Sequence, residues 1–222
     1  MSKQTVKAYN EDPAFKAAFL AEIGAHERAD ALIKGSYSQL NGQFKGCAIG
    51  CALHSLHTLQ GTLGEKHPYD DHGKVAADLG WPLWLAYLED HLFESLPNEL
   101  SKTWPRRLAE AVPVGAVITD AVLAKILVWS LTADTFGVIH ATEDTEVKGW
   151  IKAIADGITT EADETSTAEQ REAASQAARD AWDAWAARAA RAARAAETRE
   201  AFYPALSEFV LSVLRELPSG SL

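Results

Sequence analysis

Cysteine is scarce in this chain of 222 residues, which contains only Cys47 and Cys51. Two cysteines cannot build the disulfide framework that holds small secreted scaffolds together. Long hydrophobic runs are also missing, because the segment from Ala121 to Leu131, interrupted by Lys125, is well short of the ~20 apolar residues that a membrane-spanning helix needs. The N-terminus lacks the basic-then-apolar pattern of a secretory signal. We therefore expect a reduced, cytoplasmic protein without a membrane segment.

Positive charge is in short supply as well. Lys and Arg number 21 against 31 Asp and Glu, a formal charge of -10, which disfavours a generic nucleic-acid binder because phosphate repels an anionic surface. Residues 1–164 hold 14 basic and 23 acidic side chains, whereas residues 165–222 hold 7 and 8. This asymmetry predicts an acidic helical body over residues 1–158, a linker over 159–166, and a helical tail over 167–222.

Alternating apolar and polar residues do not recur over a stretch long enough for a sheet, so the predicted fold class is all-α, with a compact multi-helix body. A small hairpin or ordered loop is expected near residues 36–45, where Asn41-Gly42 is typical of a type I′ turn. Helices are expected over residues 13–34, 47–59 and 83–96, with Asp12 as the cap of the first. Two more are expected to begin at caps, one at Asp120 and one at Thr142 that ends at Gly157. Pro97 and Pro105 are expected to break the segment after residue 96 into two short pieces.

The tail has the strongest helical propensity of the chain. Thr167 followed by Gln170 matches a capping box, and alanine dominates from there to Pro204 without an intervening Gly or Pro. One long alanine-rich helix is predicted over residues 167–202, roughly 50 Å in length, followed by a helix that is kinked at Pro204. A helix of that length must span the body, protrude from it, or pair with another copy.

Arginines recur in this tail with a period of three, at Arg188, Arg191 and Arg194. They form either a cationic ridge for phosphate or an acidic partner, or, as we prefer, a solvated edge beside a packed alanine face. Trp182 and Trp185 lie about one turn apart and are expected to anchor the helix to the body or to a second subunit. The predicted partners are therefore a protein and a second copy of the chain, with nucleic acid unlikely except through the arginine stripe.

The string from Gly46 to His54 is the main candidate for chemistry. On a helix, Cys47, Cys51 and His54 are spaced i, i+4, i+7 and share one face. Four interpretations stay open. Small residues here can allow close helix packing, which we prefer, or the string can be a loop that positions a ligand. Cys47 can be a thiol activated by a helix N-terminus, which lowers a thiol pKa. The three side chains can instead hold zinc or copper, with a fourth ligand from His57, His67 or His72.

A second polar cluster comprises Glu89, Asp90, His91 and Glu94. Glu89 and Asp90 are neighbours on a helix and point about 100° apart, so we interpret the cluster as a solvated face rather than an acid–base pair. The sequence has no phosphate loop, dinucleotide fingerprint, Ser-His-Asp signature or HExxH motif, and we expect no cofactor.

Two strings and the alanine-rich C-terminal tract resemble a group of uncharacterised bacterial and bacteriophage proteins. The first is Gly-Cys-Ala-x-Gly-Cys-x-x-His, at Gly46–His54, and the second is Leu-Glu-Asp-x-x-Phe-Glu-x-Leu-Pro, at Leu88–Pro97. The resemblance implies an origin in a mobile element, where small acidic proteins often act on host or competitor proteins. The expected function is a non-enzymatic interaction or accessory factor, regulatory or anti-defence in role. The alternative is a thiol- or metal-dependent enzyme or sensor using Cys47, Cys51 and His54.

Overall fold

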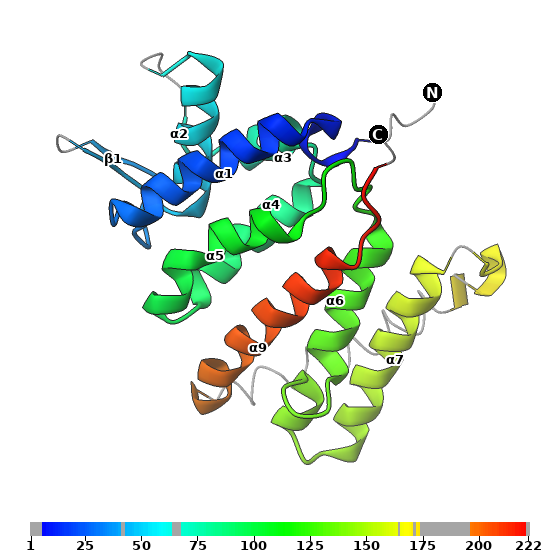
Figure 1. Ribbon diagram of the computed structural model, residues 1–222. Coiled ribbons are helices and arrows are strands. Elements are labelled where there is room, and N and C mark those ends of the chain that lie inside the picture. Colours follow the sequence, from blue (N-terminus) through cyan, green and yellow to red (C-terminus); the bar gives the residue numbers. More distant parts are fainter. Residues whose placement is uncertain are drawn as a thin grey trace. The chain divides into compact units, whose positions relative to one another are not determined.

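The structure is a computed structural model that describes residues 6–40, 43–63, 68–163, 165–170, 172–173 and 196–220. Its contacts divide the chain into two compact units, one formed by Met1–Ile118 with Leu211–Leu222 and the other by Thr119–Val210. These bounds differ from the predicted division after residue 158. Both units are built from helices (Figure 1), which confirms the all-α fold class.

The first unit is a set of helices around one apolar core. Its elements are η1 (Ala8–Glu11), α1 (Pro13–Arg28), β1 (Gln39–Leu40), β2 (Phe44–Lys45), α2 (Ala48–Gln60), α3 (His72–Leu79), α4 (Leu83–Ser95) and α5 (Asn98–Ala111). Helix α1 packs on α2 and α5, and α4 packs on α2, α3 and α5. The largest buried side chains include Phe19, Ile49, Leu53, Leu85, Phe93 and Trp104.

Helix α1 starts as predicted but ends early. Asp12 caps it, because its carboxylate accepts the N–H groups of Ala14 at 2.8 Å and Phe15 at 3.2 Å. The predicted end at Lys34 is wrong, since the helix stops at Arg28. Asp30 takes the left-handed conformation, with φ of 51°, and the N–H that follows it returns to the carbonyl of His26. This is a Schellman ending with aspartate in the place usually held by glycine.

The predicted hairpin is confirmed. β1 and β2 pair antiparallel, with Gln39 opposite Lys45 and Leu40 opposite Phe44. The expected turn residues Asn41-Gly42 lie outside the described residues. After the hairpin, Gly46 forms a parallel bridge with Leu32, which leads the chain back past the end of α1 and into α2.

Helix α5 contradicts the expectation that Pro105 divides this segment. A single helix runs from Asn98 to Ala111 with Pro105 inside it. The side chain of Trp104 is fully buried, and its indole N–H donates to the carbonyl of Glu89 at 3.0 Å. Burial of large apolar side chains on both sides of the proline offsets the ~3 kcal/mol that an interior proline costs.

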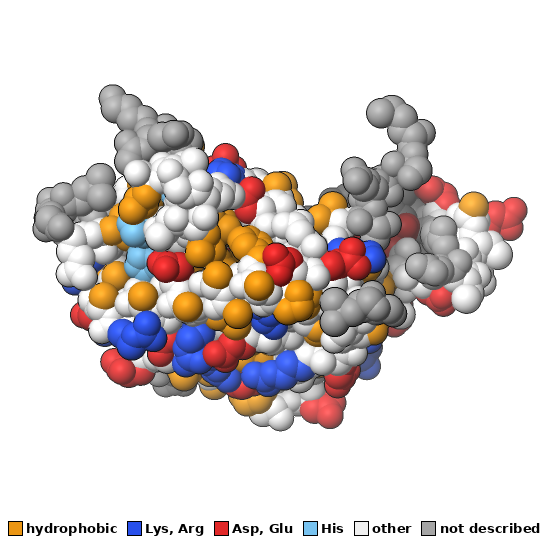
Figure 2. Space-filling view, turned by 45° about the horizontal axis from the view of Figure 1, so that its top comes forward, with side chains coloured by type: hydrophobic (Ala, Val, Ile, Leu, Met, Phe, Trp, Pro, Cys, Tyr) orange, Lys and Arg blue, Asp and Glu red, His pale blue; other side chains and the backbone are white. Residues whose placement is uncertain are grey.

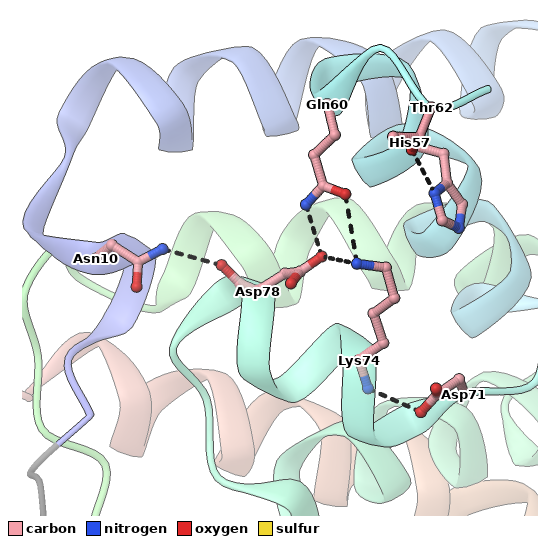
Figure 3. Close-up of polar contacts among 7 residues, drawn as sticks. All are labelled: Asn10, His57, Gln60, Thr62, Asp71, Lys74 and Asp78. Carbon is pink, nitrogen blue, oxygen red and sulfur yellow. Dashed lines mark hydrogen bonds and ion pairs between the residues drawn. The ribbon is translucent and has the colours of Figure 1, made fainter. Parts of the chain in front are cut away.

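Polar contacts attach α3 to its neighbours (Figure 3). The carboxylate of Asp78 accepts hydrogen bonds from Gln60 at the end of α2 and from Lys74 one turn earlier in α3, both at 2.8 Å. The side chain of Asn10 donates to the backbone carbonyl of Asp78 at 3.1 Å. Asp71 caps the helix through the N–H of Lys74. These bonds hold α3 in place, and its first residue, His72, contacts Asp90 of the candidate site.

The second unit contains α6 (Asp120–Thr132), η2 (Val138–Ala141), α7 (Thr145–Ala162) and the first part of α9 (Ala196–Arg215). Helix α6 packs on α7. The ring of Trp129 on α6 stacks on Phe209 of α9, with centroids 4.8 Å apart and planes 11° apart. Apolar side chains lie on nearly all sides of α6, and one of them, Leu127, is 41% exposed.

The helix caps of this unit differ from the predicted ones by one or two residues. Thr119 is the N-cap of α6, so Asp120 is the first helical residue instead. Asp144, not Thr142, caps α7, because its carboxylate accepts the N–H groups at the helix start. Gly157 does not end α7, which continues to Ala162 into the expected linker.

The tail is described only at its two ends. The capping box is confirmed at the first, where the N–H of Thr167 donates to the Gln170 side chain at 2.8 Å and the N–H of Gln170 donates to the Thr167 hydroxyl at 3.1 Å. Helix α9 runs through Pro204 as one helix. Residues 174–195, with Trp182, Trp185, Arg188, Arg191 and Arg194, lie outside the described residues, as does most of the predicted long helix. Within the described ranges, no helix has the length and apolar character that a membrane crossing requires.

Candidate functional site

A pocket of about 240 Å³ lies in the first unit, and three segments of the chain supply its walls. Gly35, Ser36 and Tyr37 come from the loop after α1, Cys47 is the N-cap of α2, and Asp90 and Glu94 lie one turn apart on α4. The site therefore joins residues that are far apart in the sequence. It contains a thiol, two carboxyl groups and a phenol.

Two glycines, Gly46 just before α2 and Gly50 within it, allow the loop after α1 to lie against the start of α2. A Cβ atom at Gly46 or at Gly50 would overlap the carbonyl oxygen of Tyr37. Glycine at both positions lets the loop cross directly over the start of α2, where the N–H of Cys47 donates to the carbonyl of Ser36 at 2.7 Å. The glycines of this string thus have the packing role that the sequence favours.

The thiol of Cys47 is protonated in this setting. Its side chain is 2% exposed, and burial is the main cause that raises its pKa to about 12. The N–H groups of Gly50 and Ile49 at the start of α2 act in the opposite direction, and the neighbouring Asp90 carboxylate raises the pKa further. The activated-thiol interpretation required a lowered pKa, so the environment of Cys47 opposes it.

Asp90 is held by a buried histidine. The Nε2 atom of His72 lies 3.1 Å from Oδ2 of Asp90, and its Nδ1 atom lies 3.1 Å from the carbonyl oxygen of Asp70. Both acceptors are oxygens, so both contacts are hydrogen bonds only when the imidazole carries two N–H groups. The ring of His72 also stacks on Tyr87, with centroids 4.4 Å apart. The carboxyl group of Asp90 also neighbours the thiol of Cys47, and this contact contributes to the raised pKa of the thiol.

Glu94 completes the polar wall. The N–H of Gly35 donates to both of its carboxylate oxygens, at 3.0 and 3.1 Å. Gly35 has a φ of 74°, a conformation that other residues rarely adopt. One potential ligand atom from each of Cys47, Asp90 and Glu94 lies within 4.8 Å of the others, which makes this trio the candidate metal-binding group among the described residues.

The alternative trio of Cys47, Cys51 and His54 is not such a group among the described residues. The thiol of Cys51 is buried against the carbonyl oxygens of Gly46 at 3.5 Å and Ala31 at 3.9 Å, and burial raises its pKa. Cys47, Cys51 and His54 therefore share a helical face, but each of their side chains makes different contacts.

Two of the histidines considered as ligands, His54 and His57, make other contacts. The ring of His54 stacks on Phe44, with centroids 4.2 Å apart, and meets His26 edge-on at 5.0 Å. The Nδ1 atom of His57 bonds to the hydroxyl of Thr62 at 2.9 Å. The spacing along α2 was correct, but the tertiary contacts draw the imidazoles into an aromatic cluster away from the pocket walls.

Glu89 corrects the interpretation of its cluster as a solvated face. Its side chain is 2% exposed, and its Oε2 atom has no hydrogen-bond partner. Burial, with a smaller contribution from the Asp90 carboxylate, raises its pKa to about 8. The signal was present in the sequence, since Glu89 is four residues after Leu85 and three before Leu92 on the buried face of α4.

Comparison of the chain with protein-family models, curated proteins and solved structures gives no match. The function must therefore be argued from the site and the surface around it.

Proposed function

We propose that this chain is a non-enzymatic interaction protein that binds a protein partner through one stripe of α4, in which Leu83, Tyr87 and Glu94 are exposed and Asp90 is half-buried. The stripe comprises Leu83, Tyr87, Asp90 and Glu94, which we call the α4 stripe. These residues are spaced i, i+4, i+7 and i+11, so they follow one face of the helix. Exposed apolar side chains lie at its start and carboxyl groups at its end.

The exposure of the apolar half is the observation that carries the proposal. Leu83 is 49% exposed and Tyr87 is 55% exposed. The ring of Tyr87 is held by its stacking on His72, so less side-chain entropy is lost when a partner covers it. Aromatic side chains of this kind are enriched among the residues that dominate binding energies. Apolar side chains also reach the surface among charged ones in Figure 2.

The acidic half of the stripe indicates the chemistry of the partner. Asp90 and Glu94 add to a chain whose formal charge is -10. A partner segment with an apolar residue followed by Lys or Arg is complementary to this arrangement, and its association is faster at low salt.

Site-specific photo-crosslinking tests the proposal. A crosslinking amino acid at position 87 should capture a discrete basic protein, which is then purified for affinity measurements. Leu63 provides the matched control, because it is 50% exposed but lies outside α4. Tyr87→Ala should weaken binding of that partner at least ten-fold, and Leu63→Ala should leave it unchanged. Equal effects of the two variants, or equal capture from both positions, would contradict the proposal.

The wider role remains a proposal that rests on the resemblance to bacterial and bacteriophage proteins. In it, the chain is a cytoplasmic accessory factor of mobile-element origin, with a regulatory or anti-defence task. The same proposal includes self-association of the chain through Trp182 and Trp185. It also includes binding of an acidic surface by the stripe of Arg188, Arg191 and Arg194. Both ideas are supported by the sequence of the tail.

The alternative that this chain is an enzyme with Cys47 as its catalytic thiol has less support. Catalysis by Cys47 requires a thiolate, and the raised pKa of its buried thiol leaves almost none at neutral pH. Cys51 and His54, the other members of the predicted trio, take part in separate contacts.

A further inference from the structure

We propose that Cys47, Asp90 and Glu94 bind a zinc ion in the pocket at the start of α2. This site goes beyond the interaction role and does not depend on it. One thiol and two carboxyl groups converge on a common volume, and the pocket leaves room for a water molecule as a fourth ligand. The ligands differ from those that the spacing along α2 suggests.

The geometry is close to what zinc requires. Ligand atoms at 2.0–2.3 Å from zinc in a tetrahedral site are roughly 3.5 Å apart. The three atoms here lie within 4.8 Å of one another, so side-chain rotations that move them by about 1 Å complete the site. Asp90 and Glu94 are one turn apart on a helix that is buried along its other face, which keeps their spacing constant.

The electrostatics of the pocket favour a cation. None of its six lining residues is Lys, Arg or His. Oδ2 of Asp90 is paired with His72, and the thiol of Cys47 is a hydrogen-bond neighbour of the same carboxyl group, whose side chain is 19% exposed. A zinc ion would take the place of the thiol proton in this contact. The convergence of a thiol with two carboxyl groups, and not the presence of acidic groups alone, is the observation that points to zinc.

The donor set selects zinc over the abundant hard cations. Calcium and magnesium prefer oxygen ligands alone, whereas zinc accepts thiolate and carboxylate together. His72 bonds to Asp90 and Gly35 bonds to Glu94, so both carboxyl groups are oriented by a second layer of hydrogen bonds. Zinc binding displaces the proton of the Cys47 thiol, and the N–H groups of Ile49 and Gly50 stabilise the resulting thiolate.

The decisive experiment is a calorimetric titration of zinc into the full chain after a chelator has removed bound metal. We expect one zinc ion per chain, and Cys47→Ala, Asp90→Asn and Glu94→Gln should each weaken binding at least ten-fold. Glu94 is exposed, so its variant keeps the fold even if the substitution at buried Cys47 does not. The matched controls are Cys51→Ala and His54→Ala, which should keep full affinity.

Cobalt supplies a second readout that does not depend on affinity. Co²⁺ in the site should give a thiolate-to-metal charge-transfer band that is absent in Cys47→Ala and present in Cys51→Ala. A chain that takes up no stoichiometric zinc overturns the proposal, and so does equal binding by the Glu94→Gln variant. Zinc binding should persist in Tyr87→Ala, so failure of the interaction role and failure of the zinc site are separate results.

Discussion

Around the pocket, the size and burial of single residues decide what chemistry is available. Glycine at positions 46 and 50 admits the loop that carries Tyr37. Burial keeps the thiol of Cys47 and the carboxyl group of Glu89 in their neutral forms, by raising the pKa values to about 12 and about 8. A helix N-terminus alone is too weak to reverse the effect of burial on a thiol.

Replacing Gly50 should be costly. In Gly50→Ala the new methyl group overlaps the backbone carbonyl of Tyr37, which cannot move aside as a flexible side chain can. We expect a loss of roughly 3 kcal/mol in the free energy of unfolding, measured by urea titration. Gly149→Ala is the control, since nothing lies within 4 Å of a Cβ there and the helical position favours alanine by up to ~1 kcal/mol. Equal stability of the two variants would refute this account.

Both thiols should alkylate slowly in the native protein. Burial raises the pKa of Cys47 and of Cys51, so very little thiolate is present at pH 7.5. Iodoacetamide labelling followed by mass spectrometry should show slow modification in buffer and rapid modification of both residues in denaturant. Rapid, selective labelling of Cys47 in buffer would instead restore the activated-thiol interpretation.

Glu89 should make the protein less stable as pH rises. Its pKa is raised from 4.5 to about 8 in the folded state, so between these values the unfolded chain has lost a proton that the folded chain keeps. The unfolded state then binds fewer protons, and stability falls with increasing pH up to about 8, by at most ~4 kcal/mol. Glu89→Gln should remove most of this slope in melts between pH 5 and 8, while exposed Glu99→Gln should not change it.

At the scale of elements, local caps and tertiary packing share control of the helices. Asp12 and the Thr167–Gln170 capping box start their helices through local hydrogen bonds. Packing overrides the local signal at Pro105, because buried side chains hold α5 together across it. Helix starts are therefore easier to predict than helix ends or interruptions.

A peptide spanning residues 167–202 should be substantially helical by circular dichroism at low temperature. The reasons are its alanine content and the capping box, whose hydrogen bonds measure 2.8 and 3.1 Å. Thr167→Ala removes the cap and should reduce helicity by an amount equivalent to about 1 kcal/mol. A coil spectrum for the parent peptide would be incompatible with the propensity argument.

At the scale of the whole molecule, two helical units share the chain, and α9 contributes residues to both. The first unit contains the pocket and the α4 stripe. The sequence features from which we predict association between copies lie in the tail.

The intact protein should self-associate in solution. Trp182 and Trp185 lie about one turn apart in an alanine-rich sequence, where they are the largest apolar side chains available to a second copy. Light scattering should give a mass above that of the 24.0 kDa monomer, and the double variant Trp182→Ala, Trp185→Ala should return it to the monomer. A monodisperse monomer for the intact protein would exclude this role for the tail.

Local patterns in the sequence determined the all-α class, the hairpin, the cap at Asp12 and the placement of α2 and α4. These features depend on residues close together in the chain, where periodicity and capping act directly. The left-handed Asp30 that ends α1 was missed, because glycine at position 35 offered the more usual stop signal.

Only the tertiary structure decided the site. Cys47, Asp90 and Glu94 come from α2 and α4, and no spacing along the chain encodes their approach within 4.8 Å. The sequence grouped Cys47 with its helical neighbours Cys51 and His54, since helical periodicity relates only residues of one element. Which side chain of α4 is enclosed and which faces the pocket depends on the elements packed against it, and those contacts set the burial, the charge state and the chemistry of each group.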